Sequence, residues 1–343
     1  MHAPNEIRHK KPAYPIGARL SEFLRSIDRG QRLPVAYHDL LRHDGLMAQH
    51  DAQGRETLWT TVMPRPAEME DLHERLVHLY QLIVADGRMV DHLRVASIDF
   101  CAFGNSQPFR IKILNQLNDN HDYYYIKQAD ASRVYGLELE HMLSPNRINY
   151  LVDGATLVEE HIIGVPGDDF IREPARYGGH LNPVRLSKEF VKFNERCFAR
   201  LLGDMRAYNF VVDVIQDFDQ VQYRLRSIDF DQQSHEGRHR IYLPQFYKEN
   251  LPYVQFARKH IDNDSARQYS NEELALLRKR YRLSQARIEE LLEVMATDKI
   301  STQAHVHQLA AELAGFHGVA ALGACQSMGQ LLGRHLKLHL GLE

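Results

Sequence analysis

The segments LLGDMRAYNFVV, residues 201–212, and RSIDFD, residues 226–231, decide the fold and the chemistry expected of this 343-residue chain. Asp204 precedes a predicted strand, and Asn209 lies five positions later, at the start of that strand. A second predicted strand ends at Asp229, and a short turn joins the two strands into a hairpin. Because the outer ends of a hairpin meet, we expect Asn209 and Asp229 to lie close together.

The composition narrows the class of protein. The chain is 44% hydrophobic and 25% charged, with a formal net charge of −3. These are ordinary values for a globular protein, and they argue against a partner such as nucleic acid. Cys101, Cys197 and Cys325 are odd in number and far apart, so we expect no disulfide framework and a reducing compartment.

Neither a secretory signal nor an apolar run of about 18 residues is visible, so we expect a cytoplasmic protein with no membrane partner. The order of predicted elements indicates an α+β fold. Residues 1–66 are polar and interrupted by prolines, which predicts short helices and loops. Apolar residues at three- and four-residue steps predict a helix from Ala67. Alternating apolar positions then predict strands over residues 95–103, 109–114, 123–128, 148–152 and 156–163, with a helix over 132–143 among them.

A helix is predicted over residues 186–202, and the chain is predicted to be helical from Ser270 to its end. Ser270-Asn-Glu-Glu273 has the pattern of a capping box. Strands followed by helices predict two lobes with a cleft between them. The predicted domains are residues 1–92, a helical extension; residues 93–165, a sheet lobe; and residues 166–343, a helical lobe.

The polar residues of the second lobe suit phosphoryl transfer, which requires an oriented hydroxyl group and a metal ion that neutralises phosphate charge. Asp204 is the candidate catalytic residue, as a general base or an orienting carboxylate. Asn209 and Asp229 are candidate Mg²⁺ ligands, because amide and carboxylate oxygens suit that ion. Asp231 shares a strand face with Asp229 and is a further candidate metal ligand.

Candidate cofactor-binding residues lie in the first lobe and the linker. Lys127, at the end of a predicted strand, is placed to anchor the phosphates of ATP. Glu138, on the packed side of the following helix, is its preferred partner over Glu140. Glu160 and Ile162 lie in the strand leading to the linker, where backbone groups are expected to bind an adenine edge.

In this order, these motifs resemble the protein-kinase-like fold in its small-molecule form, the aminoglycoside and choline phosphotransferases and related atypical kinases. The resemblance rests on Gly203-Asp204 with Asn209, Ile228-Asp-Phe-Asp231, Lys127 and the segment 160–164, and spans about residues 95–235. It implies a bilobal fold with an antiparallel-sheet N-lobe, a helical C-lobe and an extra N-terminal helical segment. It also implies an ATP- and Mg²⁺-dependent phosphotransferase that acts on a hydroxyl-bearing substrate, either a small molecule or a protein.

Some residues depart from the family pattern, and they leave alternatives open. Leu202-Gly203 replaces the usual His or Arg before the catalytic Asp, and the loop Phe103-Gly-Asn-Ser-Gln107 has one glycine where protein kinases have several. Asp-Phe-Gly and Ala-Pro-Glu segments are absent. The alternatives are a degenerate nucleotide-binding scaffold, transfer of AMP to a protein on the same fold, and a purely structural middle segment.

Histidines at helical spacing suggest a metal site less strongly. His335 and His339 are four residues apart, a spacing that can bind a metal, but the leucines around them favour ordinary packing. The basic run Arg238-His-Arg240 is interpreted as a solvated loop in preference to a phosphate contact.

Overall fold

The computed structural model describes residues 11–84, 90–176, 181–217 and 220–342. The chain divides into two compact units: unit 1, residues 1–131 and 148–161, and unit 2, residues 132–147 and 162–343. Unit 1 is dominated by an antiparallel sheet and unit 2 by helices, so the protein is of mixed α+β class. The predicted domain boundaries at residues 92 and 165 stay a prediction.

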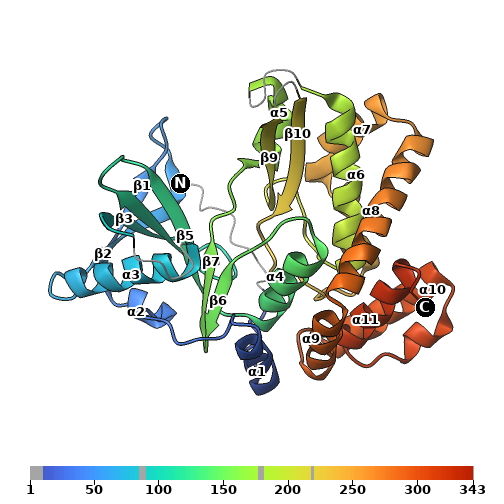
Figure 1. The fold of residues 1–343 in the computed structure, drawn as a ribbon, viewed down its shortest axis with the longest axis horizontal. Helices are drawn as coiled ribbons and strands as arrows, with labels where there is room; N and C mark the ends of the chain where they lie inside the picture. The colour runs from blue at the N-terminus through green and yellow to red at the C-terminus, as the bar shows by residue number, and fades with distance from the viewer. Residues whose placement is uncertain (1–10, 85–89, 177–180, 218–219, 343) are drawn as a thin grey trace. The chain divides into compact units, whose positions relative to one another are not determined.

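Unit 1 is built on one sheet of seven strands in the order β1-β2-β3-β4-β5-β7-β6, with every neighbouring pair antiparallel (Figure 1). Its elements are α1 (Ala18–Ser26), α2 (Tyr37–Leu40), β1 (His43–His50), β2 (Glu56–Pro64), α3 (Met69–Val84), β3 (Leu93–Phe100), β4 (Phe109–Asn115), β5 (His121–Gln128), β6 (Tyr150–Asp153) and β7 (Thr156–Glu160). The five strands predicted from the sequence are therefore all present.

Helix α3 covers one face of this sheet, as Figure 1 shows. Its apolar residues Leu72, Leu76, Leu79 and Ile83 join one buried cluster with residues of β3, β4 and β5. The Tyr124 hydroxyl donates to the Leu76 carbonyl oxygen at 2.8 Å, which satisfies the one polar atom of a fully buried ring. The apolar residues that recur at helical spacing in the sequence are thus the ones that α3 buries against the sheet.

The β1–β2 hairpin was missed, because the sequence predicted only short helices and loops over residues 1–66. Strand β1 contains residues of low β-propensity, so periodicity gave no signal. The turn is the feature that identifies the hairpin. The Asp51 carboxylate accepts hydrogen bonds from the backbone amides of Gln53 and Arg55, both at 2.9 Å. Gly54 follows with a φ of 75°, which glycine adopts without strain.

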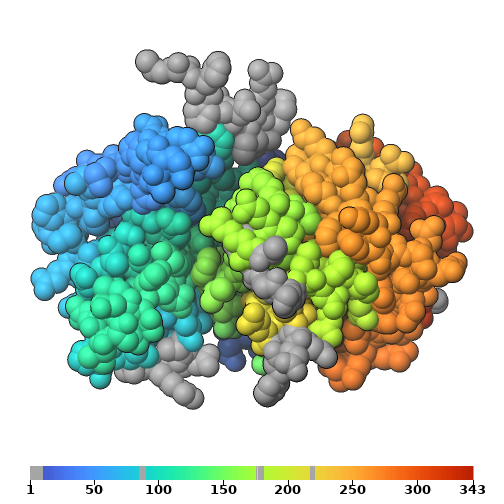
Figure 2. Space-filling view, turned by 90° about the horizontal axis from the view of Figure 1, so that it is seen from above, coloured from blue at the N-terminus to red at the C-terminus, as the bar shows by residue number. Residues whose placement is uncertain are grey.

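Unit 2 contains a three-stranded sheet, in the order β10-β9-β8, and a set of helices. Its elements are α4 (Ala131–Leu143), β8 (Val165–Pro166), α5 (Gly167–Arg172), η1 (Pro174–Arg176), α6 (Pro183–Arg200), β9 (Phe210–Asp217), β10 (Gln220–Ser227), η2 (His239–Tyr242), η3 (Pro244–Phe246), η4 (Lys248–Asn250), α7 (Leu251–His260), α8 (Asn263–Leu283), α9 (Gln285–Thr297), α10 (Gln303–His317), η5 (Ala320–Ala324) and α11 (Met328–His339). In the space-filling view, α7 and α8 form a continuous orange surface (Figure 2). The predicted hairpin and the helices predicted over residues 132–143 and 186–202 are present, and the helical stretch predicted from Ser270 is divided among α8, α9, α10, η5 and α11.

Helix α4 is bound to the rest of unit 2 by polar side chains along its length. The Tyr135 hydroxyl donates to Asp298 at 2.7 Å. Farther along the helix, Glu138 forms an ion pair with Arg287, and Glu140 forms an ion pair with Arg200. Glu138 and Glu140 are buried, where a carboxylate requires a cationic partner.

The predicted capping box at Ser270 is wrong. Helix α8 begins at Asn263, where the Asp262 side chain accepts a hydrogen bond from the Ser265 amide at 2.7 Å. Ser270 lies inside the helix, and its hydroxyl donates to Glu195 Oε1. An Asp one residue before the helix is the better cap, because its charge also favours the helix N-terminus. Cys101, Cys197 and Cys325 are buried and free, as expected.

Candidate functional site

The loop from Gly203 to Asn209 is fixed by its backbone. Helix α6 ends at Arg200, and the next residue, Leu201, has a φ of 50° that turns the chain toward Gly203. A Cβ at Gly203 would lie 3.1 Å from the Gln232 carbonyl oxygen, so the close approach of these two segments favours glycine. Asp204 follows with a φ of 57°. The left-handed backbone at Leu201 and Asp204 and the close packing at Gly203 fix the position of the Asp204 side chain.

Asp204 is held by Tyr247, from a later segment of unit 2, and by Arg206, two residues along the same loop. Its backbone amide donates to the Tyr247 hydroxyl at 3.0 Å, and its Oδ1 accepts from Arg206 Nε at 2.6 Å. Arg206 also donates to Glu249 at 3.1 Å. Burial raises the pKa of the Asp204 carboxyl above its ordinary value, and the Arg206 guanidinium only partly opposes that shift. A carboxylate with a raised pKa is a stronger general base than a solvated one.

Asn209 closes the loop. Its Nδ2 donates to the Asp204 carbonyl oxygen at 2.8 Å, and its own carbonyl oxygen accepts from the Ile228 amide at 3.0 Å. Ser227 pairs with Phe210 at the end of the β9–β10 hairpin, so Asp229 follows directly after that end. The predicted proximity of Asn209 to the segment around Asp229 is therefore present within unit 2.

Arg133, on α4, contacts both carboxylates of the Ile-Asp-Phe-Asp segment. Its Nη1 donates to Asp229 Oδ1 at 3.0 Å and to Asp231 Oδ1 at 2.9 Å. Asp229 Oδ1 also accepts from the Asp231 amide at 3.0 Å. The Arg133 side chain is 2% exposed and that of Asp231 8%, whereas the Asp229 side chain is 36% exposed. A buried guanidinium thus bridges the two carboxylates and offsets one of their two negative charges.

The predicted magnesium ligands fit that ion unequally. Asn209 uses its Nδ2 within the loop, which leaves the amide oxygen as the atom suited to a hard cation. Asp229 is partly exposed and suits a metal that retains water, but Asp231 is buried against Arg133. No group of three or more His, Cys, Asp or Glu side chains in the described residues is arranged to hold a metal. The donor set therefore fits one Mg²⁺ on Asn209 and Asp229, and does not fit one on Asp231.

Lys127 lies in unit 1, and its Nζ donates to Glu159 Oε2 at 2.7 Å. Both side chains are buried, and the ammonium group also lies 5.3 Å from the centre of the Tyr125 ring. Glu138 belongs to unit 2, where it pairs with Arg287. The pairing of Lys127 with Glu138 that the sequence predicted stays a prediction.

Glu160 ends β7, where its carboxylate accepts hydrogen bonds from the Asn149 backbone amide at 3.0 Å and from Asn149 Nδ2 at 3.1 Å. Its own backbone amide donates to the Asn149 carbonyl oxygen. Ile162 is partly buried and belongs to unit 2. The predicted role of Glu160 and Ile162 beside an adenine ring stays a prediction.

The predicted nucleotide-covering loop, residues 103–107, connects β3 to β4. Its backbone is fixed by bonds from the Gln107 amide to the Gly104 carbonyl oxygen and from the Gln128 amide to the Ser106 carbonyl oxygen, both at 3.2 Å. Tyr37 donates to the Gln107 carbonyl oxygen at 2.9 Å. A loop held by three such bonds keeps its shape without additional glycines.

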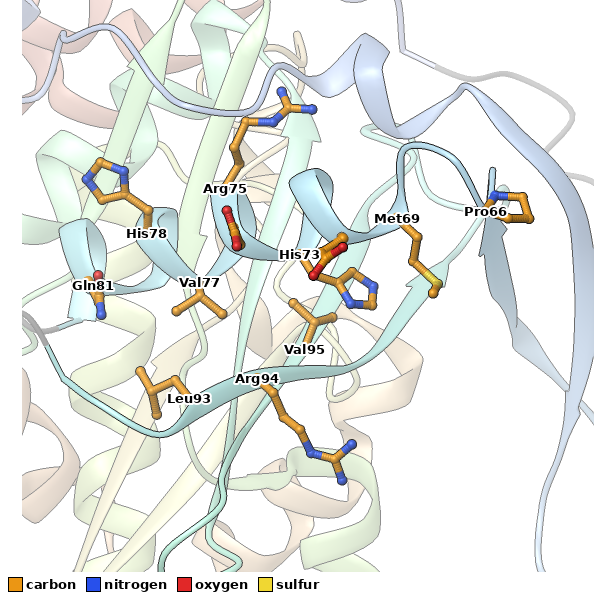
Figure 3. Close-up of a pocket in the computed structure, with 12 residues that line it drawn as sticks. Pro66, Met69, His73, Arg75, Val77, His78, Gln81, Leu93, Arg94 and Val95 are labelled. Atoms are coloured by element: carbon orange, nitrogen blue, oxygen red, sulfur yellow. The ribbon is translucent and has the colours of Figure 1, made fainter.

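A cavity of about 960 Å³ lies between α3 and β3. In Figure 3 the side chains of Met69 and His73 extend from α3 toward β3, while those of Arg75 and His78 project away. Burial lowers the pKa of His73. None of the predicted site residues lines this cavity, so it is separate from the predicted chemistry.

Two groups singled out in the sequence have structural roles. His335 is fully buried and bonds His317 and the Phe198 carbonyl oxygen, both at 2.9 Å, as the packing interpretation requires. In the basic run, His239 Nδ1 lies 2.7 Å from a Glu312 oxygen. Arg238 and Arg240 are exposed, in line with the predicted solvated loop.

Sequence reasoning missed Arg133, Glu159 and Arg206. Arg206, two residues after Asp204, could have been found, because a cation beside a half-buried carboxylate is expected. Arg133 and Glu159 carry no such local signal, since each meets its partner through packing of distant segments.

Comparison with known proteins assigns no family. No protein-family model matches the chain, and no curated protein matches it. Among solved structures, the Neurospora crassa PAN3 pseudokinase aligns over 81% of this chain and 70% of that chain, at 9% identity and a TM-score of 0.20. A TM-score this low supports no argument about fold or function. In the described part of the chain, no helix combines the length and apolar character needed to cross a membrane.

Proposed function

We propose that this protein, on a protein-kinase-like fold, binds ATP with Mg²⁺ and transfers the γ-phosphoryl group to a hydroxyl group of a small molecule or protein in the cytoplasm. The observation that carries the proposal is the loop in which Asn209 closes onto the Asp204 backbone beside the segment that holds Asp229. This loop presents a carboxylate and an amide oxygen from rigid backbone, which is what orientation of a hydroxyl group and a metal requires.

Asp204 accepts or orients the hydroxyl proton of the acceptor. Its raised pKa supports that role, because proton transfer is most efficient when the pKa of the base approaches the working pH. The ion pair with Arg206, at 2.6 Å, limits the directions in which the carboxylate can point. A base held in this way needs little reorganisation when the acceptor arrives.

Asn209 and Asp229 would hold Mg²⁺, which when bound supplies neutralisation of phosphate charge. Lys127 is proposed as the phosphate-binding cation, Glu138 as its supporting carboxylate, and Glu160 and Ile162 as the adenine-binding segment. Asp231 has no proposed metal role, because Arg133 already neutralises it.

The test compares Asp204→Asn and Asp229→Asn with the parent protein. Asn is the right replacement at Asp204, because it tolerates the left-handed backbone there better than Ala. Calorimetry would measure Mg-ATP binding, and γ-labelled ATP with a cell extract would reveal transfer. We expect Asp204→Asn to bind Mg-ATP normally and lose transfer, and Asp229→Asn to lose Mg²⁺-dependent binding. The exposed residue Asp264 provides the matched control, Asp264→Asn.

A second candidate is a nucleotide-binding module without transfer. The ion pairs of Arg133 with both Asp229 and Asp231 favour it, since they offset one of the two negative charges that would attract a metal ion. Mg-ATP binding with no labelled product would support this candidate. Transfer of an α-label would support AMP transfer instead, and a parent protein that does not bind Mg-ATP would refute the proposed function.

A further inference from the structure

The N-terminal turn of α4 is packed tightly against residues 230–233. The Ser132 hydroxyl donates to the Gln233 carbonyl oxygen at 2.7 Å. One turn later, a Cβ at Gly136 would lie 3.1 Å from Phe230 Cβ and 3.2 Å from Gln233 Cβ. These contacts fix Arg133, which lies between the two positions, against the Ile-Asp-Phe-Asp segment.

The Arg133 guanidinium is held by carboxylate and backbone oxygens on the Ile-Asp-Phe-Asp segment, as a cation with a structural role would be. A single nitrogen, Nη1, donates to both Asp229 and Asp231, and Nη2 donates to the Ile228 carbonyl oxygen at 3.3 Å. The guanidinium carbon lies 5.9 Å from the centre of the Phe230 ring. With 2% of its side chain exposed, Arg133 cannot swing into solvent without movement of α4.

A guanidinium group remains charged at every pH that proteins encounter. A divalent cation on Asp231 would meet this fixed positive charge and would take away its carboxylate partner. Separating a buried charge from its partner is strongly unfavourable. The Asp229 side chain differs, because it is partly open to solvent and also borders the Asn209 loop.

We infer that Arg133 is a built-in cation at the position where a second metal would bind, so that the site accepts one divalent cation, together with its nucleotide. This inference rests on the proposed function and deepens it, because it sets how many metal ions the site takes. Arg133 is then a specificity-determining residue for metal stoichiometry. Without nucleotide, a divalent cation binds only weakly at the Asp229–Asp231 pair, and Asp231 contributes nothing to that binding.

The test uses MnCl₂ alone, without nucleotide, on the full chain. Bound Mn²⁺ is counted by electron paramagnetic resonance, and thermal unfolding is followed in the same samples. The proteins are the parent, Asp231→Asn, Arg133→Lys, Arg133→Ala and the double variant Arg133→Ala with Asp231→Asn. We expect Asp231→Asn and Arg133→Lys to bind Mn²⁺ like the parent. We expect Arg133→Ala to melt several degrees lower, to bind Mn²⁺ about tenfold tighter, and to be restabilised by it. The double variant should lose that gain.

Weaker Mn²⁺ binding by Asp231→Asn than by the parent would overturn the inference, as would a folded Arg133→Ala with no gain. If Arg133→Ala does not fold, Asp231→Asn and Arg133→Lys decide the question, because both retain most of the polar contacts. Phosphoryl transfer does not enter these measurements. Failure of ATP binding therefore refutes the proposed function, whereas Asp231-dependent Mn²⁺ binding in the parent refutes this inference alone.

Discussion

Lys127 Nζ donates to Glu159 Oε2 at 2.7 Å across the β5–β7 pair of unit 1. Lys127 is directly opposite Leu157 and Tyr125 is opposite Glu159, so the lysine and the glutamate are diagonal neighbours on one face of the sheet. The lysine that the sequence marks as a phosphate anchor is thus held in place by a strand carboxylate. An effect of its substitution on nucleotide binding must be separated from an effect on stability.

Substitution of either member of this pair should destabilise the protein. Lys127→Met removes the ammonium group from a buried carboxylate, and we expect a loss of about 3 kcal/mol in the free energy of unfolding. Glu159→Gln should have a similar effect, whereas Lys127→Met combined with Glu159→Gln should lose much less than the sum. Urea unfolding of the four proteins forms a double-mutant cycle, and additive losses would contradict the coupling.

Glu138 should contribute to stability through α9. Its side chain is fully buried and pairs with Arg287, so Glu138→Gln should lower the free energy of unfolding by about 3 kcal/mol. Glu290, an exposed residue of the same helix as Arg287, provides the control. Glu290→Gln should change the free energy of unfolding by less than about 0.5 kcal/mol. Equal effects of the two substitutions, measured by chemical denaturation, would refute this role.

Gly329 should be the least replaceable glycine of α11. A Cβ there would collide with the backbone of Met295 and Ala296 on α9, and backbone atoms cannot rotate away. Gly329→Ala should therefore cost about 2 kcal/mol or more. At Gly333, one turn later, the nearest atom would be Leu292 Cδ1 at 3.8 Å, and Gly333→Ala should stabilise the helix by about 0.5–1 kcal/mol. Denaturation midpoints that shift in the same direction would be inconsistent with this packing.

His335 should make the protein less stable in acid. Its Nε2 lies 2.9 Å from the Phe198 carbonyl oxygen, which only accepts, so Nε2 carries the proton and Nδ1 accepts from His317. Burial lowers the pKa of His335 well below its ordinary value of about 6.5, with His339 and His317 nearby adding to the effect. Below about pH 6.5, the ring therefore stays neutral in the folded state at pH values where the unfolded chain protonates it.

The sign follows from proton binding. Below about pH 6.5 the unfolded chain binds a proton at His335 that the folded chain does not bind, so the free energy of unfolding falls as the pH falls, by up to about 1.4 kcal/mol per pH unit. His335→Gln should reduce this slope between pH 7 and pH 5, while the exposed His307→Gln should not. Denaturation midpoints across that range provide the measurement. An unchanged slope in His335→Gln would exclude His335 as the cause.

Parts of the site could be predicted because they are local in sequence. Asn209 and Asp229 lie at the two ends of a hairpin whose strands follow each other directly, so their proximity depends only on the hairpin. The five predicted strands and α3 followed from periodicity, since each buries the face that its pattern marks. Short-range geometry of this kind is encoded in the segment itself.

Other parts depend on contacts that no segment encodes. Arg133 reaches Asp229 across 96 positions, and the packing of Ser132 and Gly136 on residues 230–233 brings it there. Likewise, Lys127 meets Glu159 because β7 inserts between β5 and β6, an order that strand patterns do not determine. The β1–β2 hairpin was missed because turn chemistry at Asp51, not hydrophobic alternation, defines it.

The interleaved course of the chain has a practical consequence. The backbone passes from one unit to the other after Ala131, after Arg147 and after His161, so three covalent connections join them. A single proteolytic cut leaves both units tethered, and no contiguous fragment contains the whole of either without part of the other. Removing the whole of unit 1 from the N-terminus would also remove α4, and removing the whole of unit 2 from the C-terminus would also remove β6 and β7, so a dissection of this molecule has to proceed by substitution.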